Sequence, residues 1–347
     1  MKPLFLALAS AALALPHSAG AAKGPDPLFA GTEMIQLSIR APFDQIRASA
    51  PKSEAMFDGS LSVAGAREAH PIKVAARGIT RRKRETCSFP PLRMELAEQP
   101  PAGSLFHRQK RLKLVTHCQP AESFQQHVLL EYAAYQLMNV LTPRSLRVRL
   151  AQIDYLEPDG DKPFLRRMGF LIEDADAAAR RNGLEEADTG NIRVSQLSPK
   201  DAARYAVFQY LIGNLDWSMD AGPPGSQCCH NSKLLGARKD AATSLIPVPY
   251  DFDFSGLVDA PYAVPPDQVP VASVRTRRYR GYCRHNAEAR QIAAEVRSAS
   301  GSLQAVISQL PQLPDRPRRK ASAYLQESLS HLETDRELQS KLLKTCL

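Results

Sequence analysis

Ile72-Lys73-Val74-Ala75-Ala76-Arg77 and Leu92-Arg93-Met94-Glu95-Leu96 place apolar residues at alternate positions. Alternation with a period of two predicts β-strands that bury one face. The same pattern occurs on both sides of these two stretches. The further expected strands are residues 34–39, 59–63 and 111–115. The first third of the chain is therefore predicted to be mostly β-structure.

The pattern changes twice further along the chain. Residues 124–141 repeat apolar side chains at helical spacing, and Pro143 closes the segment. Two strands then flank the turn residues 158–161. Their expected ranges are 146–156 and 164–172. Beyond Glu173 the expected helices are 175–181, 202–212, about 287–310 and about 317–345, with short strands at 232–235 and 244–248. This order predicts an α+β protein with a mostly β lobe over 22–173 and a mostly helical lobe over 174–347.

The N-terminus has the features of a secretory signal. A positive start, Met1-Lys2, precedes a short apolar run, and Ala19-Gly20-Ala21 offers a small-residue cleavage site. The apolar run is shorter than the ~20 residues that span a bilayer. We therefore expect residues 1–21 to be a cleaved signal peptide. The mature chain is expected in the periplasm or outside the cell, with no membrane span.

Composition indicates a folded protein with a basic surface. The 347 residues are 44% hydrophobic, which argues against disorder, and the net charge is +9. Basic runs occur at residues 81–84, 108–113, 275–280 and 318–320. Such a surface fits an anionic partner, such as an envelope polymer, and export argues against nucleic acid.

An even number of cysteines in an exported chain predicts disulfides. The six are Cys87, Cys118, Cys228, Cys229, Cys283 and Cys346. We expect Cys87 to pair with Cys118, and one of the two adjacent cysteines to pair with Cys283. Cys346 is expected to tie down the last helix. Zinc is the competing interpretation, because Cys228-Cys229-His230 and Cys283-Arg284-His285 offer soft ligands.

Polar residues that suit phosphoryl transfer recur in four segments. They are Lys113 in an expected strand, Glu131 in the helix after it, Asp216 in Gly213-Asn214-Leu215-Asp216-Trp217 with Asn231 downstream, and Asp251 and Asp253 in the stretch 249–256. A cation neutralises phosphates, a carboxylate orients the attacking hydroxyl, and hard oxygen atoms bind magnesium.

Each of these residues also has a simpler interpretation. Asp216 could cap the turn after Gly213, and Asn231 could shape a turn. Lys113 and Glu131 could belong to solvated faces of a strand and a helix. Asp251 and Asp253 could be surface aspartates in a loop. They alternate with aromatic residues, however, so they share one face, where two like charges are costly without a cation.

The run Gly213–Trp217, then Asn231, then Pro249-Tyr250-Asp251-Phe252-Asp253-Phe254-Ser255-Gly256 resembles the atypical kinases of the spore coat protein CotH family. It is more distantly similar to the HipA and phosphoinositide kinase-like groups. The stretch 76–81 with Ser88-Phe89-Pro90 is similar to that family's phosphate-side segment. The resemblance covers about residues 70–260.

The resemblance implies a two-lobed atypical protein-kinase-like fold that uses ATP and Mg²⁺ or Mn²⁺. Asp216 would be the catalytic aspartate, and Asn231 and Asp251 would bind the metal, with Asp253 as the reserve. Lys113 would bind phosphate, and Glu131 would hold that lysine. A cleft between the two lobes would hold the ligand.

The chain departs from the family at two places. The usual lysine after Phe-Pro is missing, so either Arg93 or Lys113 would take its role. Residues 220–229 form an insertion that a disulfide could staple. The expected function is therefore an exported kinase-like transfer of phosphate from ATP to a hydroxyl on a protein or small molecule. The alternative is an inactive pseudokinase that binds an anionic envelope partner.

Overall fold

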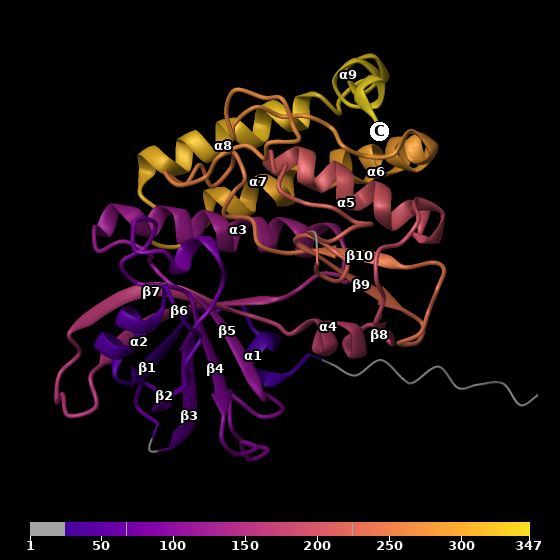
Figure 1. Cartoon of the computed structure of the whole chain (residues 1–347). Coiled ribbons are helices and arrows are strands. Elements are labelled where there is room, and N and C mark those ends of the chain that lie inside the picture. Colours follow the sequence, from indigo (N-terminus) through magenta and orange to yellow (C-terminus); the bar gives the residue numbers. More distant parts are fainter. Residues whose placement is uncertain (1–24, 67, 224) are drawn as a thin grey trace, which may run out of the picture.

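The computed structural model describes residues 25–66, 68–223 and 225–347. The expected signal peptide, residues 1–21, lies outside the described residues. Figure 1 shows two regions: strands from the first half of the chain form one, and helices from the second half gather against it. A helix of the first half, α3 (Gln125–Leu141), lies between them.

Seven strands of the first half form a closed barrel. They are β1 (Ile35–Arg40), β2 (Phe57–Val63), β3 (Ala69–Ala76), β4 (Leu92–Leu96), β5 (Arg111–Val115), β6 (Val148–Leu156) and β7 (Leu165–Ile172). Their order is β1-β2-β3-β4-β5-β7-β6, and β1 closes the barrel against β6. That last pairing is parallel, and the other six are antiparallel. Alternate apolar side chains, among them Leu37, Val74 and Leu114, fill the interior.

The predicted two-lobed kinase-like fold is wrong. The strands of the first half close into a mixed barrel, whereas that fold would have an open sheet in its N-terminal lobe. The parallel pairing of β1 with β6, with Leu37 opposite Ile153, causes the closure. Alternation in a sequence identifies a strand and its buried face, but it does not identify the strand's partner.

Two short helices lie against the barrel: α1 (Pro27–Ala30) and α2 (Phe43–Ser49). Phe43 of α2 is fully buried and contacts the rings of Phe89 and Tyr155. These aromatic rings close one part of the barrel core. The barrel is therefore a filled core without a channel.

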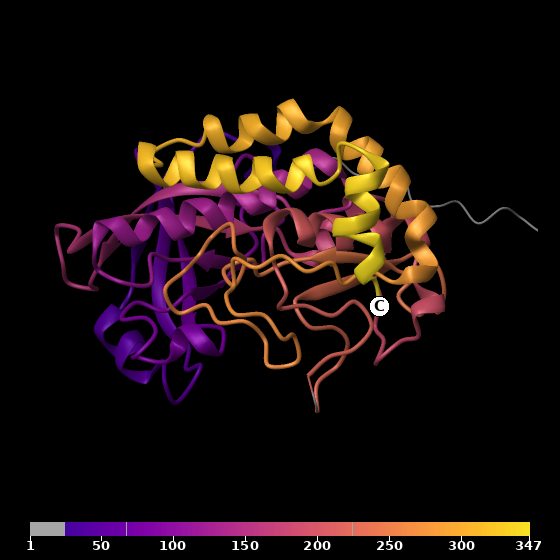
Figure 2. The same cartoon turned by 90° about the horizontal axis from the view of Figure 1, so that it is seen from above.

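A second core lies outside the barrel and joins it to the helical half. Helix α3 is buried along most of its length and packs on the outer faces of β6 and β7. The other helices are α4 (Ala175–Arg181), α5 (Pro199–Ile212), α6 (Asn286–Ser298), α7 (Ser300–Ser308), α8 (Asp315–Ser330) and α9 (Asp335–Lys341). Helix α7 contacts both α3 and α8. Figure 2 shows the long yellow helix running alongside an orange helix of the same half.

The two long C-terminal helices of the sequence prediction are each divided. The first predicted helix breaks at Ala299 into α6 and α7. The second breaks after Ser330, where α8 ends, and α9 begins at Asp335. Thr334 caps α9 by accepting a hydrogen bond from the Glu337 backbone N–H. A small antiparallel sheet completes this half. Its strands are β8 (Glu185–Glu186), β9 (Ser232–Gly236) and β10 (Ile246–Pro249).

All six cysteines lie among the described residues, and each forms a disulfide. Cys87 pairs with Cys118, as predicted. The other predicted pair is wrong: Cys228 bonds to its neighbour Cys229, and Cys283 bonds to Cys346. No thiolate is therefore left in this structure for the zinc interpretation. Three disulfides indicate an oxidising, non-cytoplasmic compartment.

None of the helices in the described part of the chain combines the length and apolar character needed to cross a bilayer.

Candidate functional site

The end of α5 positions Asp216. Gly213 ends the helix with φ of 64°, a left-handed conformation that glycine adopts easily. A side chain at this position would also meet the Tyr324 ring. The next residue, Asn214, accepts a hydrogen bond from the Asp216 backbone N–H, at 3.0 Å. The Gly213–Trp217 segment is therefore a fixed turn that presents the Asp216 carboxylate.

The β9–β10 hairpin brings Asn231 and Asp251 together. Ser232 at the start of β9 lies opposite Pro249 at the end of β10. One residue further out, the Tyr250 backbone N–H donates to the Asn231 carbonyl, at 3.1 Å. Asn231 and Asp251 both have positive φ, 51° and 63°, which is uncommon for residues other than glycine. Such conformations cluster at functional sites.

Asn231 and His230 hold the Asp216 carboxylate. The Asn231 amide donates to the Asp216 carbonyl at 2.7 Å and to Oδ2 at 3.0 Å. His230 Nε2 lies 2.7 Å from Asp216 Oδ1. This hydrogen bond raises the pKa of His230 above its usual value. Both carboxylate oxygens of Asp216 therefore have a fixed partner.

Arg280 supports the same turn from behind. It donates to the carbonyl oxygens of Leu215, at 2.6 Å, and Trp217, at 2.9 Å, the two neighbours of Asp216. Its guanidinium carbon lies 4.8 Å from the centre of the Trp217 ring. The sequence prediction found no functional motif in the last quarter of the chain, yet this arginine fixes the backbone on both sides of Asp216.

Three carboxylates surround one buried guanidinium. Arg81 lies in the 3₁₀ turn η1 (Thr80–Arg82), and its nitrogens are 3.3 Å from Glu131 Oε2, 3.3 Å from Asp253 Oδ2 and 3.9 Å from Asp251 Oδ1. Glu131 is 1% exposed and Asp253 is 4% exposed. Tyr262 donates a further hydrogen bond to Asp253, at 3.0 Å.

This cluster has more negative charge than its arginine balances. Burial raises the pKa of Glu131 and of Asp253 above their ordinary values; Arg81 opposes that rise, and the neighbouring aspartates add to it. One oxygen from each of Glu131, Asp251 and Asp253 lies within 4.8 Å of the others. Glu131 Oε1 is buried and has no hydrogen-bond partner. Converging carboxylate oxygens, one of them unpartnered, fit a hard divalent cation such as Mg²⁺ or Mn²⁺.

Stability should therefore fall with rising pH when no divalent cation is present. A buried carboxyl whose folded pKa is raised stabilises the fold while it is protonated, and this contribution is lost from its ordinary value of 4.5 upward. The Glu131→Gln variant cannot lose that proton. In EDTA, the melting temperature of the variant relative to that of the unsubstituted protein should rise from pH 5 to pH 8, as measured by scanning calorimetry. A constant difference would contradict the assignment.

Two cations in the described part of the chain, Arg77 and Lys113, are not paired with an acid. Among the described residues, neither Arg77 nor Lys113 has a carboxylate oxygen within 4 Å. Burial lowers the pKa of Lys113; the nearby Asp174 opposes this, and Arg77 lowers it further. Arg77 also lowers the pKa of Glu131. Its charge therefore acts on both the Lys113 strand and the Glu131 helix.

The roles implied for Glu131 and Arg93 differ in the structure. Glu131 pairs with Arg81, so the predicted pair with Lys113 is not formed. Arg93 lies 3.6 Å from Glu54 and 3.5 Å from Glu95, so its guanidinium is occupied by other acids. Asn231 lies with Asp216, while Asp251 and Asp253 lie with Glu131. The charges of Asp216 and Asp251 both raise the pKa of Asp253, so these groups share one neighbourhood.

Sequence reasoning missed Arg81, Arg77, His230 and Arg280 as site residues. Arg81 belongs to the basic run 81–84, which is typical of a solvated surface, so the sequence pattern assigns it no individual role. Its available signal was its position inside the stretch 76–81 that resembles a phosphate-side segment. His230 was considered only as a partner of the cysteines, although it directly precedes Asn231.

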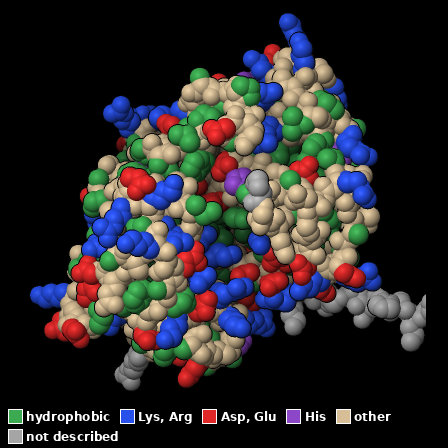
Figure 3. All heavy atoms as spheres, in the orientation of Figure 1, with side chains coloured by type: hydrophobic (Ala, Val, Ile, Leu, Met, Phe, Trp, Pro, Cys, Tyr) green, Lys and Arg blue, Asp and Glu red, His purple; other side chains and the backbone are tan. Residues whose placement is uncertain are grey.

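Neither protein-family models nor curated proteins match this chain. The resemblance to the CotH family therefore rests on the motif text alone. Figure 3 shows the face seen in Figure 1 in space-filling form. This face is hollowed near its middle, between the barrel and the helical half, and acidic, basic and histidine side chains gather there.

Proposed function

We propose that the protein is an exported phosphotransferase that uses ATP and a divalent cation to phosphorylate a hydroxyl group. The observation that carries the proposal is the carboxylate set Glu131, Asp251 and Asp253, in which Glu131 and Asp253 are buried. It has three carboxylates against one guanidinium, and Glu131 Oε1 has no partner. A divalent cation would balance the remaining negative charge.

The unpaired cations Arg77 and Lys113 suit the phosphates of a metal-bound nucleotide triphosphate. A nucleotide triphosphate brings several negative charges next to the metal, and phosphoryl transfer depends on positioning and charge neutralisation. Arg77 and Lys113 act electrostatically on each other, and Arg77 also acts on Glu131. Burial, with a smaller contribution from Arg77, lowers the pKa of Lys113, and phosphate oxygens between these two cations would oppose both effects.

Asp216 fits the role of orienting the acceptor hydroxyl. Its carboxylate is held by Asn231 and His230, and its backbone is held by Asn214 and Arg280. A carboxylate held by two side chains, on a turn whose backbone is held by two more, presents a defined oxygen to an incoming O–H group. An acceptor hydroxyl would take the place of one present partner, and His230, whose side chain is 38% exposed, is accessible enough to be displaced.

Binding without turnover is the second candidate. It is favoured by the present engagement of both Asp216 oxygens and by the basic side chains that remain without acids. In this case an anionic envelope partner would occupy the Arg77 and Lys113 side of the site. Such affinity would fall as salt is added and would not require the metal.

Calorimetric titration with ATP and Mn²⁺ tests the proposal. We expect binding that needs the metal, disappears in Asp251→Ala and weakens roughly tenfold or more in Lys113→Met, one charge-assisted contact being worth about 1.5–3 kcal/mol. Asp251 is the best metal-side variant, because its side chain is 40% exposed and its loss should leave the fold intact. Lys110→Met, an exposed residue beside the same strand, is the matched control and should bind as before.

The other outcomes are equally informative. Absence of heat in the unsubstituted protein would overturn the nucleotide site. Binding that persists in EDTA and in Asp251→Ala, and weakens with salt, would favour the second candidate.

A further inference from the structure

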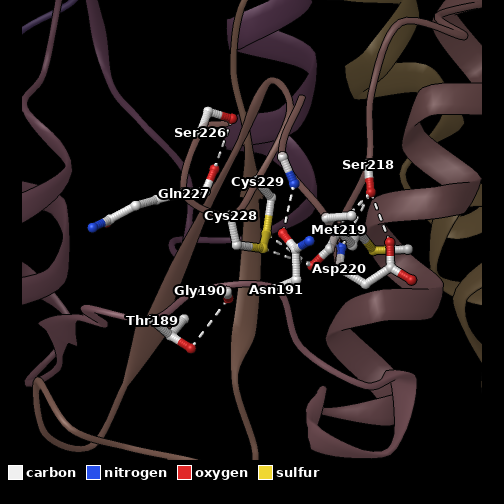
Figure 4. Close-up of a disulfide and its surroundings, with 12 residues drawn as sticks. Thr189, Gly190, Asn191, Ser218, Met219, Asp220, Ser226, Gln227, Cys228 and Cys229 are labelled. Atoms are coloured by element: carbon white, nitrogen blue, oxygen red, sulfur yellow. Dashed lines mark hydrogen bonds between the residues drawn. A yellow bond between two sulfur atoms is a disulfide. The ribbon is translucent and has the colours of Figure 1, made fainter. Parts of the chain in front are cut away.

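The turn that holds Asp216 is followed by a loop that carries its own disulfide. We call residues 218–230 the disulfide loop. It leaves the Asp216-Trp217 turn and returns at His230, beside Asn231. The bond joins Cys228 to Cys229 near the end of the loop. Figure 4 shows the two cysteines beside Met219, and Cys229 Sγ lies 3.2 Å from the Met219 carbonyl oxygen.

This bond cannot stabilise the protein as a long cross-link does. A disulfide restricts the unfolded chain more when it closes a longer loop. Cys87–Cys118 spans 31 positions and Cys283–Cys346 spans 63, whereas Cys228–Cys229 joins neighbours. The effect of the adjacent pair is therefore local, on the shape of the chain just before His230.

The bond is also accessible to a thiol. Thiol–disulfide exchange requires that an attacking thiolate reach one sulfur. Cys228 and Cys229 are partly exposed, and so are their neighbours Ser226 and Gln227. Cys87 and Cys118, by contrast, are buried, whereas Cys283 is exposed and Cys346 is partly exposed. Within one molecule, the adjacent pair should react well before the buried pair.

Backbone hydrogen bonds also hold the described part of the disulfide loop, residues 218–223 and 225–230. The Ser218 backbone N–H donates to the His230 carbonyl at 2.9 Å, and the His230 N–H donates to the Ala221 carbonyl at 3.1 Å. The Gly222 N–H donates to Asn191 Oδ1 at 3.0 Å. These contacts determine where His230 lies, and His230 in turn contacts Asp216. Opening the Cys228–Cys229 bond, which joins the two residues directly before His230, would loosen the position of the His230 side chain.

We propose that Cys228–Cys229 is a reversible redox-modification site, with an exported dithiol protein as its reductant. The reductant's thiolate attacks one sulfur, the Cys228–Cys229 bond breaks, and a mixed disulfide forms. The second thiol of the reductant then attacks the mixed disulfide, so the reductant leaves with its own two sulfurs joined. Cys228 and Cys229 become two thiols with one proton each, and together they have gained two electrons from the reductant. The loss of the His230 hold on Asp216 is the consequence, and its effect on turnover rests on the proposed function.

The chemistry is tested with dithiothreitol as the probe. The folded full-length protein is treated with increasing concentrations, free thiols are alkylated, and modified cysteines are identified by peptide mass spectrometry. Cys228 and Cys229 should be labelled at concentrations at least tenfold below those needed for Cys87 and Cys118. Labelling of the adjacent pair only together with the buried pair would overturn the proposal.

The structural consequence has a readout that does not depend on ATP. Amide hydrogen exchange of Ser218 and His230 should become at least tenfold faster after reduction, while exchange in β9 stays the same. The Cys228→Ser/Cys229→Ser variant should show this faster exchange without reductant, and reductant should add nothing there. If exchange is unchanged in the reduced protein and in the double serine variant, the disulfide does not fix the position of His230. Failure of ATP binding in the unsubstituted protein would overturn the proposed function and leave these two results interpretable.

Discussion

Replacing Arg81 by leucine should lower the free energy of unfolding by about 3–5 kcal/mol, the usual cost of removing one member of a buried ion pair. Among the described residues, its guanidinium is the only basic group within 4 Å of all three acids. Without it, Glu131 and Asp253 would remain buried with no opposite charge. They would have to take up protons, so the loss should be larger at pH 8 than at pH 5. Urea unfolding at the two pH values measures both effects.

Arg82→Leu is the matched control for this prediction. The neighbouring arginine pairs with Glu54 at 2.7 Å, but that carboxylate is 43% exposed. A solvent-accessible pair contributes about 1 kcal/mol or less. If Arg81→Leu costs no more than Arg82→Leu, the buried carboxylate cluster is not held by Arg81. Added Mn²⁺ should partly restore Arg81→Leu, since a cation would then face three acids without a competing guanidinium.

Much of the secondary structure could be predicted from the sequence, because its patterns are local. The strand over 92–96, the strand over 111–115 and the helix over 175–181 have the predicted bounds. The arrangement of the strands could not be predicted. Whether β1 ends as an edge or closes onto β6 depends on contacts between residues more than a hundred positions apart, such as Leu37 and Ile153. No local period encodes that pairing, so the sequence predicts a mostly β lobe of a kinase-like fold where the structure has a closed barrel.

The cysteines show the same limit. Cys87 and Cys118 lie in two segments that run side by side, because Phe89 and Cys118 form an isolated β-bridge. Their pairing could be predicted. The bond between Cys283 and Cys346 depends on how the last helices pack, because that packing brings the end of the chain beside Cys283. Sequence spacing gave no reason to prefer it over a bond from Cys283 to the adjacent pair.

The candidate site could be predicted in part for a chemical reason. Asp251 and Asp253 were recognisable because two acids alternate with aromatic residues at the end of an apolar strand, a costly arrangement without a cation. The partner of Glu131 was not recognisable. An arginine buried among acids and an arginine on a solvated face look alike in a sequence, since both can stand in a basic run. Burial, which only the fold provides, distinguishes Arg81 from Arg82.

Replacing Asp216 by asparagine should separate turnover from binding. If Asp216 orients the attacking hydroxyl, Asp216→Asn should lower the rate of phosphate transfer roughly 10²–10⁴-fold, the usual contribution of a positioned base. Affinity for ATP with Mn²⁺ should change little, because Glu131, Asp251 and Asp253 remain. With the acceptor unidentified, ATP hydrolysis serves as the assay, since water can take the place of the hydroxyl.

Two comparisons make this result specific. Asp188→Asn changes an exposed carboxylate of the same half of the protein, which pairs with Lys239, and it should hydrolyse ATP at the unsubstituted rate. Asp251→Ala should lose binding and hydrolysis together. Asp216→Asn that loses affinity as strongly as Asp251→Ala would place Asp216 in the metal site instead. Hydrolysis that is unaffected by Asp216→Asn would remove this residue from the reaction, and the hold of His230 and Asn231 on its carboxylate would then serve only the shape of the turn.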